Sequence, residues 1–170
     1  MSYLKIKETL LFGLVAMSLL FTACGGDDDE GCSLELNLPD TSTSSLFAAE
    51  EGIIDDYLLE NNLQAVRTPS GLRFIVTEDI LGLPDRPTLC SEVNVDYVGY
   101  YLSGEEFDSG TSISFGLSRV IDGWKEGIAL FGEGTTGTII FPSYLGYGNN
   151  PPPGIRTNAI LAFDVTLNSF

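Results

Sequence analysis

The sequence predicts an α+β domain, in which an antiparallel β-sheet is covered on its apolar face by one short α-helix. Four segments in the C-terminal part of the chain have the apolar alternation or short apolar runs typical of strands. One segment between them repeats apolar residues every three to four positions, which is the period of a helix. The chain also contains 19 Gly and 8 Pro, which favours many turns over long helices.

Length and composition indicate one globular domain. With 170 residues, the chain is long enough for one domain with its own core and too short for two of typical size. Hydrophobic residues make up 44% of the chain and charged residues 19%, which is the balance of a folded protein.

Charge and histidine content exclude several functional classes. The formal net charge of −16 repels phosphate backbones, so nucleic acid is not expected as a partner. The chain has no His, which is the commonest general base near neutral pH and the commonest metal ligand. Ser-His-Asp, Cys-His and HExxH chemistries are therefore excluded, and we expect neither a cofactor nor a metal.

Residues 1–23 have the pattern of a signal peptide. Lys5 and Lys7 give a positive start, residues 10–21 form a mostly apolar run, and Thr22 and Ala23 form a small-residue cleavage site. An apolar run of about 12 residues is shorter than the roughly 20 needed to cross a bilayer as a helix, so a permanent membrane span is the weaker interpretation.

The residue that follows this leader is Cys24, which resembles the lipid-modified cysteine of a bacterial lipobox, although Phe21 stands where Leu is usual. The resemblance implies a lipid-anchored outer membrane protein of the cell envelope, periplasmic or surface-exposed, and plain secretion is the alternative. Residues 24–44 are predicted to be a flexible acidic linker. Its acidic run at residues 27–30 is either a solvated tether or a signal for export to the cell surface.

Two further cysteines, Cys32 and Cys90, would enter an oxidising compartment with the mature chain. A disulfide between them would pin the linker to the domain. The sequence does not supply the geometry that a disulfide requires, so a disulfide and two free thiols both stay open.

Residues 45–66 are predicted to form an amphipathic helix ahead of the main domain. Ser44 or Ser45 is a plausible N-cap, and the helix is expected to end near Asn61. Its apolar residues fall on one face at positions 46, 47, 53, 54, 57 and 58. This face would pack either on its own domain or on a second copy of the chain.

Residues 67–170 hold the strands and the short helix. The predicted strands are residues 72–76, 93–102, 138–141 and 159–167. A turn at Ser103 and Gly104 leads the second strand back toward Glu106 and Phe107. The short helix is predicted from apolar residues three to four positions apart, which are Val120, Ile121, Trp124, Ile128 and Phe131.

Five short motifs follow one another in this region. They are Val-Asp-Tyr-Val-Gly at 95–99, Gly-Glu-Glu-Phe-Asp-Ser at 104–109, Val-Ile-Asp-Gly-Trp-Lys-Glu-Gly at 120–127, Tyr-Leu-Gly-Tyr-Gly at 144–148 and Leu-Ala-Phe-Asp-Val at 161–165. In this order they resemble the successive signatures of the FKBP family of peptidyl-prolyl cis/trans isomerases. The resemblance implies a strongly twisted antiparallel sheet wrapped around the short helix, and rotation about the peptide bond before proline as the activity.

The resemblance also implies the residues of a site. Trp124 would form the floor on which the substrate proline lies, Tyr147 would offer its hydroxyl to a substrate carbonyl, and Asp108 would lie beside the twisting amide. Six further residues are implied as pocket walls and substrate contacts, namely Tyr97, Phe107, Val120, Ile121, Ile155 and Phe163. The structural alternatives are a core role for Trp124, an ordinary loop aromatic at Tyr147 and a turn cap at Asp108.

Catalysis of amide rotation does not require a His residue. Resonance in the C–N bond sets a rotation barrier of about 18 to 20 kcal/mol, and no bond to proline is made or broken. An enzyme for this step needs only a surface that binds the twisted amide better than the planar forms. An apolar pocket does so, because twisting reduces the charge separation in the amide.

Two departures from the family pattern bear on ligand choice. Thr111 stands where many members have an aromatic residue, which predicts a thinner pocket wall and lower affinity for macrolides. The loop at residues 149–158 is one residue shorter than usual and carries Arg156 and Thr157 in place of Ile-Pro.

The expected partners are proline-containing segments of unfolded exported proteins. The alternatives are a non-catalytic binding module of the holdase type on the same fold, and a surface adhesin or scaffold.

Overall fold

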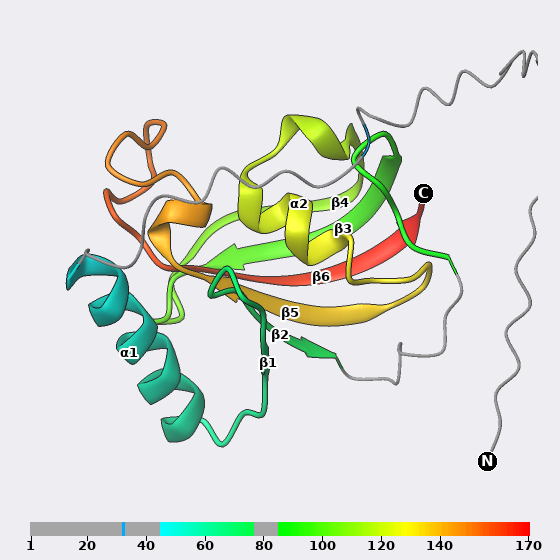
Figure 1. The fold of residues 1–170 in the computed structure, drawn as a ribbon. Coiled ribbons are helices and arrows are strands. Elements are labelled where there is room, and N and C mark those ends of the chain that lie inside the picture. Colours follow the sequence, from blue (N-terminus) through cyan, green and yellow to red (C-terminus); the bar gives the residue numbers. More distant parts are fainter. Residues whose placement is uncertain (1–31, 33–44, 77–84) are drawn as a thin grey trace, which may run out of the picture.

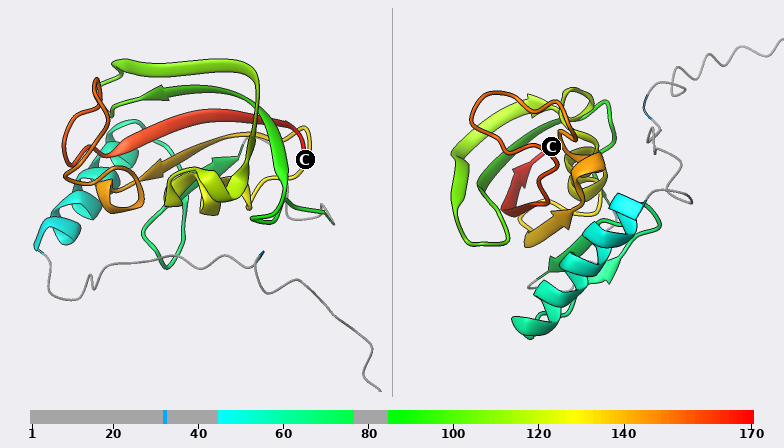
Figure 2. Two further views of the ribbon diagram at one scale, coloured as in Figure 1. Left: turned by 90° about the horizontal axis from the view of Figure 1, so that it is seen from above. Right: turned by 90° about the vertical axis from the view of Figure 1, so that its left-hand side faces the viewer.

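The computed structural model describes residues 32, 45–76 and 85–170. The predicted signal peptide, the predicted lipidation site Cys24 and all of the predicted linker except Cys32 lie outside the described residues. The described part folds as predicted into an α+β domain, in which a six-stranded antiparallel sheet curls around a short helix (Figures 1 and 2). None of the helices in these ranges has the length and apolar character needed to cross a membrane.

The sheet has the strand order β1-β2-β5-β6-β3-β4, with every neighbouring pair antiparallel. Its strands are β1 (Val66–Arg67), β2 (Arg73–Val76), β3 (Glu92–Tyr100), β4 (Glu106–Gly116), β5 (Thr136–Phe141) and β6 (Leu161–Ser169). The last strand of the chain, β6, lies between β5 and β3 in the middle of the sheet (Figure 1). It therefore places the last of the five motifs beside the first.

The helix α2 (Asp122–Ile128) packs in the hollow of the curled sheet (Figure 2). Two glycines permit the close approach, because a Cβ at Gly123 would lie 2.6 Å from the ring of Phe141, and one at Gly127 would lie 2.8 Å from Ile139. The helix is shorter than its apolar spacing suggested. Val120 and Ile121 precede it in extended conformation.

The strand β4 is the longest in the sheet, although the sequence predicted only a chain reversal toward its first residues. Its side chains are mostly exposed, so it lacks the apolar alternation that identifies a half-buried strand. Its pairing with β3 is also irregular between Val95 and Tyr97 and between Gly99 and Tyr100. Both features hide a strand from pattern analysis.

The helix α1 (Ser45–Glu60) packs on the other face of the sheet from α2. Ile54 and Leu58 pack against Ile140 on β5 and Ala162 on β6. The residues next to these in the strands, Ile139 and Phe163, belong to the main core. Successive residues of a strand point to opposite faces of the sheet, so α1 and the main core lie on different faces. The helix ends at Glu60, so residues 61–65 of the predicted segment form a turn and a link to β1.

The predicted apolar face of α1 is wrong in part. Ile53 and Leu46 are 52% and 44% exposed, whereas Glu50 is only 3% exposed. The Glu50 carboxylate accepts hydrogen bonds from the backbone N–H and the hydroxyl of Ser143, at 2.9 and 2.7 Å. These bonds replace the water that the carboxylate loses, so an acidic residue is stable on the inner side of the helix.

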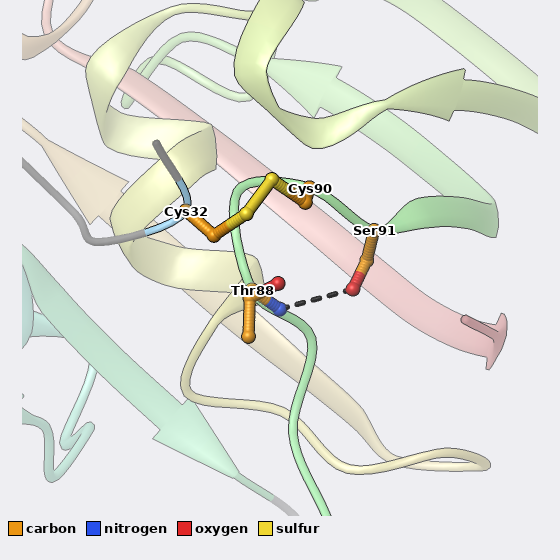
Figure 3. The surroundings of a disulfide bond; sticks show 4 residues. All are labelled: Cys32, Thr88, Cys90 and Ser91. Atoms are coloured by element: carbon orange, nitrogen blue, oxygen red, sulfur yellow. Dashed lines mark hydrogen bonds between the residues drawn. A yellow bond between two sulfur atoms is a disulfide. The ribbon is translucent and has the colours of Figure 1, made fainter. Parts of the chain in front are cut away.

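Cys32 and Cys90 form a disulfide that joins segments 58 residues apart in the sequence (Figure 3). Cys90 lies in a short turn in which the Thr88 N–H donates to the Ser91 hydroxyl at 3.0 Å (Figure 3). The Leu89 N–H donates to the Cys32 carbonyl at 3.4 Å. The disulfide therefore attaches residue 32 to the edge of the domain just ahead of β3.

Candidate active site

A cavity of about 760 Å³ opens between α2, the concave face of the sheet and the loop that precedes β6. All nine residues that the sequence implicated line it, although they come from segments far apart in the chain. They are Tyr97, Phe107, Asp108, Val120, Ile121, Trp124, Tyr147, Ile155 and Phe163.

The floor of the cavity is the indole of Trp124, which α2 presents toward the sheet. The side chain is 6% exposed, and three aromatic rings meet the indole at steep angles. The ring centroids of Phe163, Tyr97 and Phe115 lie 5.1, 5.2 and 5.5 Å from that of the indole. Trp124 thus belongs to the core and to the cavity at once, and such edge-to-face contacts hold its ring in one orientation.

One wall is formed by Phe107 on β4 and Phe163 on β6, whose rings meet edge to face at 5.5 Å. Gly99 on the intervening strand β3 makes this contact possible. A Cβ at Gly99 would lie 2.7 Å from Phe163 and 2.9 Å from Phe107, so any larger residue would push the two rings apart.

The rim carries the polar groups. The Tyr97 hydroxyl donates a hydrogen bond of 2.9 Å to Asp108. Partial burial, with this bond and the negative charge of Asp108, raises the pKa of Tyr97 to about 12. Burial and the Asp108 charge also raise the pKa of Tyr147. A carboxylate and two protonated phenols therefore stand at the mouth of an apolar hollow.

Val120 and Ile121 approach the cavity as extended backbone ahead of α2. Ile121 is the N-cap residue of the helix, and its carbonyl accepts the N–H groups of Trp124 and Lys125 at 2.9 and 3.1 Å. The same residue therefore lines the cavity and starts the helix that carries the floor.

The loop at residues 149–158 covers one side of the cavity through Ile155 and two prolines, Pro152 and Pro153. Arg156 attaches the loop to the turn between β3 and β4. Its guanidinium lies 4.1 Å from the ring centroid of Tyr101 and pairs with Glu105, and the backbone N–H of Arg156 donates to the Tyr101 hydroxyl at 3.1 Å. The replacement of the usual Ile-Pro end thus supplies an anchor for the loop.

Five cavity residues were missed by sequence reasoning, namely Ile113, Phe115, Arg119, Pro152 and Pro153. Ile113 and Phe115 are two positions apart on β4, a spacing that places both on one face of a strand. That signal was available once β4 was recognised as a strand. Thr111 is exposed and does not line the cavity.

The arrangement can bind an apolar group in the hollow while polar groups engage its backbone at the rim. Six of the fourteen lining residues are aromatic, and the hydroxyls of Tyr97 and Tyr147 with the Asp108 carboxylate can hydrogen bond at the mouth. In the residues that the structure describes, no cluster of three or more His, Cys, Asp or Glu has the geometry of a metal site.

Comparison with known proteins gives one consistent result. A sequence profile of the FKBP-type peptidyl-prolyl cis-trans isomerases matches residues 84–168, which is 85 of 170 residues, or half of the chain. The "FKBP-type peptidyl-prolyl cis-trans isomerase FkpA" of Aeromonas hydrophila is 36% identical over 119 residues, which are 66% of this chain and 44% of that protein.

Solved structures agree with the profile. The crystal structure of FkpA from Escherichia coli superposes with a TM-score of 0.62 at 32% identity, covering 72% of this chain and 59% of that one. A peptidyl-prolyl cis-trans isomerase from Pseudomonas syringae gives a TM-score of 0.60 over 75% of this chain and 97% of its own, and at 22% identity it shows the fold alone. The chain spans less than half of the Aeromonas relative and less than two thirds of the E. coli structure.

Proposed function

Since this chain belongs to the family of FKBP-type peptidyl-prolyl cis-trans isomerases, we propose that it catalyses rotation about the peptide bond that precedes proline. The observation that carries the proposal is the aromatic cavity, which has Trp124 at its floor and the Tyr97–Asp108 pair and Tyr147 at its rim.

The cavity suits the physics of the reaction. A planar amide is stabilised by charge separation that water solvates, and twisting the C–N bond removes this charge separation. Inside an apolar, partly dehydrated hollow the planar forms lose more solvation than the twisted form. The protein therefore favours the twisted form, and preferential binding of that form lowers the barrier.

Three side chains have distinct roles in this proposal. The proline ring lies on the indole of Trp124. The Tyr147 hydroxyl donates to a substrate carbonyl and fixes the chain beside the proline. Asp108 stands beside the twisting amide and holds the Tyr97 ring against the floor through their hydrogen bond.

The test is a protease-free isomerisation assay on a short Xaa-Pro peptide, with the purified chain and its disulfide intact. Uncatalysed exchange takes tens to hundreds of seconds, and we expect the chain to accelerate it. A macrolide should compete for the cavity, with an affinity lowered by the missing aromatic at position 111. If exchange stays at its uncatalysed rate while the chain suppresses aggregation of an unfolded proline-rich client, the function is that of a holdase.

We further propose that the protein assists folding of exported proteins from a lipid anchor at Cys24 in the cell envelope. The leader pattern of residues 1–23 supports this, as does the Cys32–Cys90 disulfide, since disulfides persist mainly in oxidising compartments. Metabolic labelling with a clickable fatty acid tests the anchor. Label should enter the parent chain and be lost from Cys24→Ser, and a parent chain without label would refute the anchor.

A further inference from the structure

The turn that carries Tyr147 is organised around one backbone carbonyl. The carbonyl of Ser143 accepts the N–H groups of Gly146 and Gly148, at 3.0 and 2.9 Å. These two glycines flank Tyr147, and the Gly148 N–H belongs to the peptide group that directly follows it, so the backbone on both sides of Tyr147 is held by Ser143. Gly148 in turn accepts the N–H of Asn158 at 2.8 Å, which connects the same turn to the loop over the cavity.

Ser143 is itself held by a residue of α1. The two oxygens of the Glu50 carboxylate take separate donors, the backbone N–H of Ser143 at 2.9 Å and its hydroxyl at 2.7 Å. Glu50 is 3% exposed and Ser143 is 2% exposed. A bidentate, charge-assisted pair shielded from water fixes both the position and the orientation of Ser143.

Tyr144, the residue after Ser143, also contacts α1 and the segment that follows this helix. The ring of Phe47 meets that of Tyr144 edge to face, with centroids 4.3 Å apart. The Tyr144 hydroxyl donates to the Ser70 carbonyl at 2.6 Å. The start of the α1 helix therefore lies directly beside the 3₁₀ turn Ser143–Leu145, as the ribbon also shows (Figure 1).

We propose that Glu50 is a positioning residue for the reaction, which orients the Tyr147 hydroxyl through Ser143 and the two flanking glycine amides. The inference rests on the proposed isomerase function and on the role of Tyr147 in it. It makes α1 a functional part of the site, although the helix lies outside the residues that match the family profile.

The same helix supplies a control. Asp55 is also on α1, and it binds the buried guanidinium of Arg73 on β2 at 2.7 Å. Removal of its carboxylate loosens the docking of α1 without touching a partner in the Tyr147 turn. If α1 acts only as a structural support, loss of Glu50 and loss of Asp55 should therefore affect turnover alike.

The experiment measures kcat and KM for an Xaa-Pro peptide in the parent, Glu50→Ala, Glu50→Gln and Asp55→Ala, each also combined with Tyr147→Phe. We expect Glu50→Ala to lower kcat/KM by about three- to tenfold, the worth of one well-placed hydrogen bond. Gln keeps an acceptor for the Ser143 N–H and a donor for its hydroxyl, so Glu50→Gln should stay within about twofold of the parent.

The combination with Tyr147→Phe separates positioning from general destabilisation. If Glu50 acts through the Tyr147 hydroxyl, Glu50→Ala should cost almost nothing further once that hydroxyl is gone. Asp55→Ala should leave kcat/KM of the folded protein unchanged in both backgrounds. Hydrogen exchange of the Gly146 and Gly148 amides should be faster in Glu50→Ala and unchanged in Asp55→Ala.

The outcomes are distinguishable. A parent chain without turnover overturns the proposed function, and the positioning role with it. An active parent in which Glu50→Ala equals Asp55→Ala, or in which the Glu50→Ala loss persists in full beside Tyr147→Phe, overturns the positioning role alone. If Glu50→Ala does not fold, Ser143→Ala removes only the hydroxyl bond, and the same dependence on the Tyr147 hydroxyl is expected of it.

Discussion

The floor and the rim of the cavity are built in opposite ways. The floor consists of side chains that are also core, since Trp124 and Phe163 are only 6% and 4% exposed and come from a helix and a central strand. At the rim, Tyr97 packs on this core, but the other two groups lie outside it, since Tyr147 is 37% exposed on a turn and Asp108 is exposed on β4. Substitutions in the floor should therefore change stability and activity together, whereas substitutions of Tyr147 and Asp108 should change activity alone.

Trp124→Ala should have the largest effect. Removing a buried indole deletes apolar contacts and leaves a void, which costs about 3 to 5 kcal/mol of unfolding free energy. It also removes the surface for the substrate proline, so kcat/KM should fall by at least about tenfold. Urea denaturation and the isomerisation assay measure the two effects.

Phe131→Ala is the matched control for the floor. Phe131 is fully buried in the same core but does not line the cavity. It should lose a similar unfolding free energy while the folded fraction keeps its turnover. Normal turnover in Trp124→Ala would mean that the floor has no part in the site.

Asp108→Asn should separate the two regions most clearly. The change removes a charge beside the reacting amide and weakens the hydrogen bond from Tyr97, so we expect kcat/KM to fall by about tenfold. Because the group is exposed, the unfolding free energy should change by less than about 1 kcal/mol.

A second Tyr–Asp pair provides the control. The Tyr100 hydroxyl donates to Asp164 at 3.1 Å, and Asp164 does not line the cavity. Asp164→Asn should leave turnover intact. Equal losses in the two variants would show that neither carboxylate has a special place in the reaction.

The floor and most of the rim could be predicted from the sequence because motif and local structure coincide there. The 120–127 motif contains both the two glycines that let α2 pack closely and the indole between them. Phe115 and Ile113 could not be placed in the same way. Their strand is mostly exposed and irregularly paired, so neither periodicity nor a motif marks it.

The link between α1 and the Tyr147 turn was also invisible in the sequence. An acidic residue in an amphipathic helix is expected on its solvent-exposed side, so Glu50 was not included in the predicted buried face. Its burial depends on a partner 93 residues away. Long-range polar pairing of this kind has no local signature, whereas apolar burial does.

Tyr147→Phe should have a smaller effect than the loss of Asp108. It removes one hydroxyl at an accessible position, so kcat/KM should fall by about three- to tenfold while the unfolding free energy stays the same. The loss should appear for peptides with a carbonyl in reach of the hydroxyl. Tyr100→Phe, which removes a hydroxyl outside the cavity, is the control. Equal turnover in Tyr147→Phe and the parent would remove Tyr147 from the site.

The smallest effect is expected from pH. Ordinary tyrosines ionise near pH 10, but burial and the charge of Asp108 raise the pKa of Tyr97 to about 12 and shift the pKa of Tyr147 upward as well. Both rim phenols therefore stay protonated as donors, and kcat/KM should be level from about pH 7 to about pH 10. A decline centred at or below pH 10 would mean that a rim phenol titrates as if the cavity did not surround it.

The raised pKa of Tyr97 also determines the direction in which the stability of the fold changes with pH. Above pH 10 the unfolded chain has released the Tyr97 proton while the folded chain still holds it, so the folded state binds more protons and stability falls as pH rises. The contribution is complete below about pH 10 and is lost toward about pH 12. Asp108→Asn removes the negative charge that helps to raise this pKa, so its phenol titration, followed by ultraviolet absorbance, should begin at lower pH than in the parent. An unchanged titration would show that the Asp108 carboxylate does not affect the pKa of Tyr97 and that burial alone raises it.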